Sequence, residues 1–287
     1  MKKKILSLMI MVLIVLGCFV GCGNIKIEQE NSTVGTEWIS ENVQNSDNVF
    51  SEVTLNINVA ASLKDTITEI SEIYNEIQPN VKIIINADSS GTLQKQIEEA
   101  AGTDIDMFFS ASTKQMEKLQ EEGYIEDNSV SNLLKNQVVL ISAKGSGTKV
   151  TGFENITNAK NFALAGESVP VGQYSREIFA TLGITGEVNA MEINQCDNVS
   201  AVKNAVVEGS NEVGTVYYSD YNLVKDKVDL IEKADESWCN PIVYPVGIVK
   251  NPNADENQKK AIEDFNKFLQ TDEAKEVFEK YMFIVNN

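Results

Sequence analysis

The sequence contains no histidine among its 287 residues. This absence excludes catalytic sets that need an imidazole base, such as Ser-His-Asp and Cys-His arrangements, and it excludes the HExxH zinc helix. Basic residues are also scarce, with 24 Lys and Arg against 42 Asp and Glu, which gives a formal net charge of −18. Because surfaces that bind nucleic acid are basic, this balance argues against a general binder of the phosphate backbone.

Several familiar motifs are missing as well. The sequence has no GxGxxG, no Walker-type phosphate loop and no GxSxG. What is present is ordinary for a globular protein, with 43% hydrophobic and 23% charged residues. The length suits one or two domains with a sizeable core.

The first residues have the composition of a targeting segment. Three lysines at positions 2–4 precede an apolar run that continues to about residue 20, which is typical of a secretory signal peptide. The run ends in Gly21-Cys22, and a small residue before cysteine resembles the bacterial lipobox, in which the cysteine becomes lipidated. We expect a signal peptide over 1–22 with lipidation at Cys22, while Cys18 and a plain N-terminal membrane anchor remain alternatives. Residues 23–52 are polar without clear periodicity, which indicates a flexible tether.

From residue 53 the apolar pattern alternates between the periods of strands and helices. The order implies a mostly parallel α/β sheet, but there are too many units for one sheet of typical size. We therefore expect two lobes, with 53–137 and 241–287 forming lobe I and 138–240 forming lobe II. The expected strands cover residues 53–60, 81–85, 105–109, 137–143, 162–165, 188–193, 213–217, 228–231 and 242–249. Helices are expected after residue 62, over 93–101, 112–121, 173–182, 199–207, 255–270 and 272–281, and after residue 217.

Beyond the signal peptide the chain has two cysteines, Cys196 and Cys239. Outside the cytoplasm they could form a disulfide, and two separate thiols are the alternative. The sequence shows no CxxC motif and no cluster with metal-ligand spacing.

The junctions between strands and helices carry hydroxyl and small residues instead of charged ones. Ser62 and Ser90 each follow an expected strand, and Val171 and Val199 stand where later helices begin. One such junction is explained by helix capping alone. Together, their hydroxyls, free N–H groups and helix N-termini can hold a small anion by neutral donors. Arg176 is nearby, and we expect it to be solvated or paired with a surface acid.

Three acidic residues suggest an alternative function. Asp104 and Asp106 flank an apolar residue at strand spacing, and Asp220 follows another strand. They could serve an extracytoplasmic enzyme based on carboxylates, but no base of another type accompanies them. We interpret Asp104 and Asp106 as a solvated strand entrance.

The junctions resemble, in order, motifs of the periplasmic molybdate-binding protein family, which supplies the solute-binding component of molybdate ABC importers. The resemblance covers residues 53–287. The segments that carry it are Ala-Ala-Ser-Leu-Lys-Asp at 60–65, Ser-Ser-Gly-Thr-Leu at 89–93, Asp-Ile-Asp-Met-Phe-Phe-Ser-Ala at 104–111, Val-Pro-Val-Gly at 169–172 with Tyr174, Gly-Thr-Val-Tyr-Tyr-Ser-Asp at 214–220 and Tyr-Pro-Val at 244–246.

This resemblance implies a two-lobed, type II periplasmic-binding-protein-like fold with the ligand cleft between the lobes. It also implies an oxyanion site without direct side-chain ligands to the metal and without a cofactor. The residues implied as contacts are the hydroxyls of Ser62, Ser90 and Tyr217 and the N–H groups of Val171 and Val199.

Two positions depart from the family pattern. Val171 stands where alanine is usual, which should affect only local packing if the contact is a backbone N–H. Asp88 lies two residues before Ser90, and a carboxylate that faced an anion would cost affinity. We therefore expect Asp88 to turn away, as an Asx-type cap.

The implied function is capture of molybdate or tungstate outside the membrane and delivery to the permease subunits of an ABC importer. The protein would be a monomer, would be held at the membrane by its N-terminal lipid, would bind no nucleic acid and would catalyse no reaction. The alternatives are a binding protein for sulfate, phosphate or an organic acid, and the carboxylate enzyme described above.

Overall fold

The computed structural model describes residues 50–286. The expected signal peptide, Cys18, Cys22 and nearly all of the expected tether lie outside the described residues. Residues 46–287 belong to one compact unit. Among the described helices, none has both the length and the apolar character needed to cross a membrane.

The first sheet has six strands in the order β11-β4-β10-β3-β1-β2. They are β1 (Val53–Ala60), β2 (Val81–Asp88), β3 (Met107–Phe109), β4 (Ser131–Lys135), β10 (Val243–Ile248) and β11 (Ile284–Val285). β1, β2 and β3 are parallel, whereas β10 runs antiparallel to β3 and β4. The helices in these parts of the chain are α1 (Lys64–Ile77), α2 (Ser90–Ala100), α3 (Thr113–Glu121), α8 (Glu256–Phe268) and α9 (Asp272–Lys280).

The second sheet has five strands in the order β7-β6-β8-β5-β9. They are β5 (Val138–Ala143), β6 (Phe162–Ala165), β7 (Ile193–Cys196), β8 (Val213–Tyr217) and β9 (Val228–Lys233). β6 is parallel to β7 and β8, and β5 is antiparallel to β8 and β9. Its helices are α4 (Pro170–Thr181), α5 (Thr185–Asn189), α6 (Val199–Val207) and α7 (Tyr218–Val224), with short 3₁₀ turns at Phe153–Asn158 and Glu236–Trp238. A further 3₁₀ turn, Ala61–Leu63, follows β1 of the first sheet.

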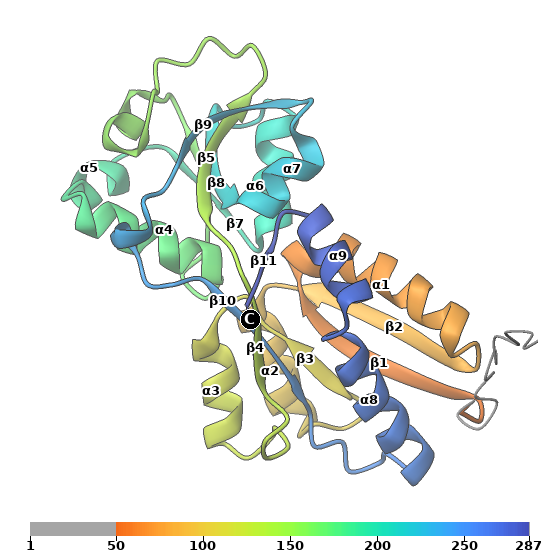
Figure 1. Ribbon diagram of the computed structural model, residues 1–287. Coiled ribbons are helices and arrows are strands. Elements are labelled where there is room, and N and C mark those ends of the chain that lie inside the picture. The colour runs from red at the N-terminus through yellow and green to blue at the C-terminus, as the bar shows by residue number, and fades with distance from the viewer. Residues whose placement is uncertain (1–49, 287) are drawn as a thin grey trace, which may run out of the picture. The chain divides into compact units, whose positions relative to one another are not determined.

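The chain passes from the first sheet to the second between β4 and β5, and it returns between β9 and β10 (Figure 1). The first sheet therefore combines an early and a late part of the sequence, and α8 and α9 of the late part contact β1 and α1 of the early part. We call the first sheet with its helices lobe I and the second lobe II. The exact division at residues 137 and 240 stays a prediction.

Local sequence features, namely apolar periodicity, N-caps and proline, explain where several helices begin and end. In α1 the apolar positions Ile67, Ile70 and Tyr74 recur on one face and are buried, and Pro79 follows the helix end. The Ser89 hydroxyl caps α2 by accepting from the Thr92 N–H, and other side-chain caps are Ser112, Asn198, Asp255 and Thr271.

The strand expected over 188–193 is wrong. A short helix, α5, ends at Asn189 and covers the start of that range, and the strand β7 begins only at Ile193. Val188 is buried as the single apolar anchor of α5, so five residues offer too little periodicity to indicate a helix. The expectation of a mostly parallel arrangement also needs correction, because β4, β5, β9, β10 and β11 all make antiparallel pairs.

Cys196 and Cys239 are both free thiols in this structure. Cys196 is buried at the end of β7 and Cys239 is half-buried after the Glu236–Trp238 turn. Burial raises the pKa of both thiols, to about 11 for Cys239, so both groups are protonated at neutral pH.

Candidate functional site

A small cavity lies where several strand ends and helix starts meet. Its lining includes all five residues for which the sequence predicts oxyanion contacts. The lining residues are Ala60, Ala61, Ser62, Ser89, Ser90, Ala111, Val169, Pro170, Val171, Val199 and Tyr217. They come from the ends of β1, β2 and β3 in lobe I, and from α4, α6 and the end of β8 in lobe II.

The two serines present their hydroxyls in similar ways. Ser62 is buried in the 3₁₀ turn after β1, and Ser90 is the first residue of α2 and is also buried. The Ser90 oxygen accepts a hydrogen bond from the Ala111 N–H at 2.9 Å. The Ser62 oxygen lies 3.0 Å from the Tyr244 hydroxyl. Each oxygen is thus already held by a neighbour, and within the described residues neither serine has another hydrogen-bond partner.

Two helix N-termini supply backbone donors. Val171 is the second residue of α4, after Pro170, and Val199 is the first residue of α6. Neither N–H finds an acceptor among the described residues, as is usual in a first helical turn. The positive end of each helix dipole points the same way as these N–H groups, so both termini favour an anion.

Tyr217 contributes a buried hydroxyl with no partner. Its side chain is only 1% exposed, and its oxygen makes no hydrogen bond within the described residues. Such an orphan polar group costs stability unless something else satisfies it. Burial raises the pKa of the phenol well above its usual value, so Tyr217 remains a neutral donor at every physiological pH.

Asp88 does not line the cavity, so it turns away as expected, but the expected cap is wrong because Ser89 is the N-cap of α2. Its Oδ1 accepts from the Ser89 N–H at 2.7 Å and from the Asn198 amide Nδ2 at 3.2 Å. Asn198 in turn caps α6 through its other side-chain atom, which accepts from the Ala201 N–H. The carboxylate is therefore engaged by donors at the rim.

No charged side chain lines the cavity. The expectation for Arg176 is wrong, because its guanidinium is half-buried and donates to the carbonyls of Ala165 and Gly172 at 2.8 and 2.7 Å. A long side chain in the second turn of α4 can fold back to the carbonyls beside that helix, which local sequence does not indicate. Arg176 thus fixes α4 against the end of β6.

The acidic residues considered for an enzyme do not gather at this cavity. Asp106 is fully buried, contrary to the expected solvated entrance, and its carboxylate accepts from Asn56 N–H, Asn251 and Gln258. Asp220 is also fully buried and lies 3.7 Å from Lys203. Burial raises the pKa of Asp220 to about 6, while Lys203 opposes the shift. Neither carboxylate lines the cavity.

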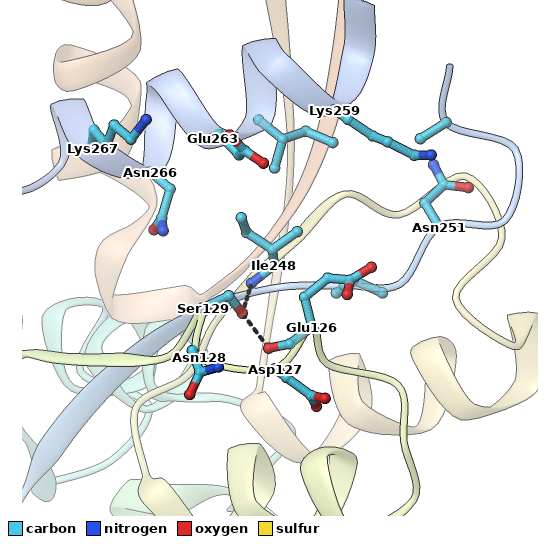
Figure 2. Close-up of a pocket in the computed structure, with 13 residues that line it drawn as sticks. Glu126, Asp127, Asn128, Ser129, Ile248, Asn251, Lys259, Glu263, Asn266 and Lys267 are labelled. Atoms are coloured by element: carbon cyan, nitrogen blue, oxygen red, sulfur yellow. Dashed lines mark hydrogen bonds between the residues drawn. The ribbon is translucent and has the colours of Figure 1, made fainter. Parts of the chain in front are cut away.

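A larger cavity, of about 500 Å³, lies elsewhere in lobe I (Figure 2). It is bounded by the 126–129 loop, the end of β10 and α8, and Ser129 joins two of these by accepting from Ile248 N–H and donating to the Glu126 carbonyl. Lys259 and Lys267 alternate there with acidic and amide side chains. None of the predicted contact residues is present, and the described residues hold no cluster of potential metal ligands.

The arrangement gathers neutral hydrogen-bond donors from both lobes around one cavity, as in a protein that binds a small solute. Residues 55–284 match the family described as bacterial extracellular solute-binding protein. The chain belongs to this family.

Individual relatives agree with this assignment. The chain is 38% identical over 241 residues to YvgL of Bacillus subtilis (strain 168), named for an inferred role as an ABC transporter substrate-binding lipoprotein, covering 84% of this chain and 90% of that protein. It is 32% identical over 231 residues to the molybdate-binding protein ModA of Haemophilus influenzae, covering 78% and 87%.

A solved structure from Clostridium difficile, titled as the substrate-binding domain of an inferred molybdenum ABC transporter, is 34% identical to the chain. It aligns with a TM-score of 0.62 and covers 82% of this chain and 99% of that domain. The expected two-lobed, type II periplasmic-binding-protein-like fold is confirmed, as is the resemblance to the molybdate-binding family.

Sequence reasoning missed three residues that support the site. Asn136 and Tyr244 lie behind Ser62, and Asn198 bridges to Asp88. The Asn198 cap is visible in sequence as an asparagine directly before a helix. Tyr244 and Asn136 are 182 and 74 positions from Ser62, so no local pattern indicates their contacts.

Proposed function

We propose that this protein binds molybdate or tungstate at the cavity around Ser62 and Ser90 and delivers the anion to an ABC importer. The observation that carries the proposal is the convergence of hydroxyl and N–H donors on one cavity that no charged side chain lines. The relatives named for molybdate support the same ligand class.

Neutral donors suit capture and release. A lysine or arginine in the cavity would attract a dianion more strongly, but it would also slow release of the dianion to the importer. Hydrogen bonds to a charged group contribute about 1.5–3 kcal/mol each. About five such bonds, less the costs of closure and ordering, support sub-micromolar affinity.

The size of the cavity indicates how binding would proceed. Its volume of about 10 Å³ suffices for roughly one water molecule. A tetrahedral oxyanion is larger, so the facing segments of the two lobes must separate slightly to admit it and then close on it. The chain segments between β4 and β5 and between β9 and β10 are the hinges for this movement.

The test is calorimetric titration of the full chain in mild detergent with molybdate, tungstate, sulfate, phosphate and a small carboxylate. We expect sub-micromolar binding of molybdate and tungstate and much weaker binding of the others. Equal binding of sulfate would make the protein a general oxyanion binder, and preference for a carboxylate would replace the ligand assignment.

The location follows from the N-terminal sequence. We propose that the protein is anchored outside the cytoplasm by a lipid on Cys22, with Cys18 as the alternative, and acts as a monomer that docks on the permease subunits. Mass spectrometry of the purified N-terminal peptide decides which cysteine carries lipid. An uncleaved N-terminus would instead indicate a plain membrane anchor.

A further inference from the structure

Tyr244 lies directly behind Ser62 and is not part of the cavity lining. It is fully buried, and its ring packs edge-on against Tyr217 and Phe283 at centroid distances of 5.7 and 5.3 Å. Its hydroxyl has two partners in the described part of the chain, the Ser62 oxygen at 3.0 Å and the Asn136 amide nitrogen at 3.4 Å. The Tyr244 ring contacts the Tyr217 ring, and the Tyr244 hydroxyl reaches the site through Ser62.

The direction of the hydrogen bonds is determined by Asn136. Its Oδ1 accepts from the Gln137 N–H at 2.9 Å, which turns its Nδ2 toward Tyr244 and Ser219. An amide nitrogen only donates, so the Tyr244 oxygen accepts from Asn136. The one hydrogen of the phenol then goes to Ser62, because the neighbouring Tyr217 hydroxyl makes no hydrogen bond within the described residues.

This chain of donors fixes the Ser62 hydroxyl. Its oxygen accepts from Tyr244, so its own hydrogen is free to point into the cavity. Ser90 is held in the same sense, since its oxygen accepts from the Ala111 N–H. The other predicted contacts are the N–H groups of Val171 and Val199 and the Tyr217 hydroxyl, and each of them can donate. Ser89 also lines the cavity, but its hydroxyl is engaged with the Thr92 N–H and the Thr92 hydroxyl.

We propose that Tyr244 is a specificity-determining residue that, through Ser62, keeps the cavity a site of donors only and so selects fully deprotonated oxyanions. This inference rests on the proposed function. A protonated oxyanion carries an O–H group that needs an acceptor. In this cavity the group stays unpaired, or Ser62 must rotate and break its bond with Tyr244, and either outcome lowers affinity.

The test is Tyr244→Phe, which keeps the ring packing and removes the hydroxyl. Molybdate affinity should fall roughly two- to tenfold, because the Ser62 hydroxyl is no longer oriented. Phosphate, which keeps at least one proton at neutral pH, should gain an acceptor in Ser62. We therefore expect the preference for molybdate over phosphate to narrow by about tenfold, measured by competition against bound molybdate.

Sulfate provides an internal control for cavity size. It is fully deprotonated at neutral pH, as molybdate is, so the molybdate-to-sulfate ratio should not change in Tyr244→Phe. Tyr74→Phe is the matched control variant. It removes another buried phenol hydroxyl, which donates to the Asp264 carboxylate over 2.8 Å. Neither residue lines the cavity, so Tyr74→Phe should leave all three affinities unchanged.

A double substitution separates this role from a general effect on folding. In a Ser62→Ala background, Tyr244→Phe should no longer change the molybdate-to-phosphate ratio, because the group through which it acts is absent. An unchanged ratio in the single variant overturns the inference, as does an equal change in the Ser62→Ala background. A wild-type chain that binds none of the three anions overturns the proposed function itself, and the inference with it.

Discussion

The side-chain amide of Asn198 donates to the carboxylate of Asp88 at 3.2 Å and thereby joins the start of α6 in lobe II to the end of β2 in lobe I. The same Asn198 side chain caps α6 by accepting from the Ala201 N–H. One residue therefore positions an anion-binding helix and connects the two lobes across the rim of the cavity. These two roles can be separated by substitution.

Asn198→Ser should lower oxyanion affinity without lowering stability. Serine is a good N-cap, so α6 keeps its capping bond, but a serine side chain is too short to reach Asp88. We expect affinity to fall about three- to tenfold, since the bridge is a hydrogen bond to a charged group in the closed form. Calorimetric titration and the thermal midpoint of the free protein measure the two effects.

Asn198→Ala provides the comparison, because it removes both the cap and the bridge. It should lower stability by about 1 kcal/mol as well as affinity. Thr271→Ala removes the cap of α9, which does not line the cavity, and it should lower stability while leaving affinity unchanged. A Ser variant with wild-type affinity would show that the bridge contributes nothing to binding.

Gly91→Ala should impair closure of the lobes. A Cβ atom at Gly91, in the first turn of α2, would lie 2.3 Å from the Ser168 carbonyl oxygen in the loop before α4. The clash is with a backbone atom, so a change of side-chain rotamer cannot relieve it. The two lobes would therefore have to stay further apart. We expect molybdate affinity to fall by more than tenfold, and the thermal midpoint of the free protein to stay the same or rise, because alanine favours helix over glycine by about 1 kcal/mol.

Gly186→Ala is the control for this change. Gly186 lies in α5, and a Cβ there would meet nothing within 4 Å. It should leave affinity unchanged. Wild-type affinity in Gly91→Ala would mean that the ligand-bound form is more open than this structure.

Local sequence determined the parts of the site that sit at helix starts. The positions of Ser62 and Ser90, each after a strand and at a helix start, could be predicted from local sequence, because free N–H groups and hydroxyls gather there in α/β folds. Their choice as anion contacts comes from the resemblance to the molybdate-binding family. The Tyr244 and Asn136 support could not be predicted, since those contacts depend on how distant strands meet. Asp106 illustrates the same limit, because its alternating neighbours indicate an exposed edge whereas Asn251 and Gln258, more than 140 positions away, enclose it.

Ser62→Ala and Ser90→Ala should each lower molybdate affinity roughly tenfold or more, through loss of one charge-assisted hydrogen bond. Ser90→Ala should also lower stability slightly, since the Ala111 N–H loses its acceptor. Ser71→Ala is the control, because that serine is buried in α1 and its hydroxyl donates to the Ile67 carbonyl, away from the cavity. Unchanged affinity in both site variants would remove the cavity from consideration.

The rate of oxyanion association should rise with salt concentration. The chain carries a formal charge of −18, which repels a dianion at long range, whereas the site attracts it by local dipoles. Unscreened electrostatic interactions extend over about 30 Å at 0.01 M salt but only about 8 Å at 0.15 M. Added salt therefore weakens the long-range repulsion more than the short-range attraction at the site. Stopped-flow measurement across this range tests the expectation, and a falling rate would show that positive potential around the site dominates the approach.

Tyr217→Phe should stabilise the free protein while weakening binding. Among the described residues the buried Tyr217 hydroxyl has no hydrogen-bond partner, and removing such a group recovers part of a cost of about 1–3 kcal/mol. The same hydroxyl would donate to a bound oxyanion, so affinity should fall by roughly tenfold. The thermal midpoint should therefore rise without molybdate, and the further rise caused by saturating molybdate should be smaller than in the wild type. If the midpoint falls and affinity is unchanged, the hydroxyl serves packing in lobe II and does not face the anion.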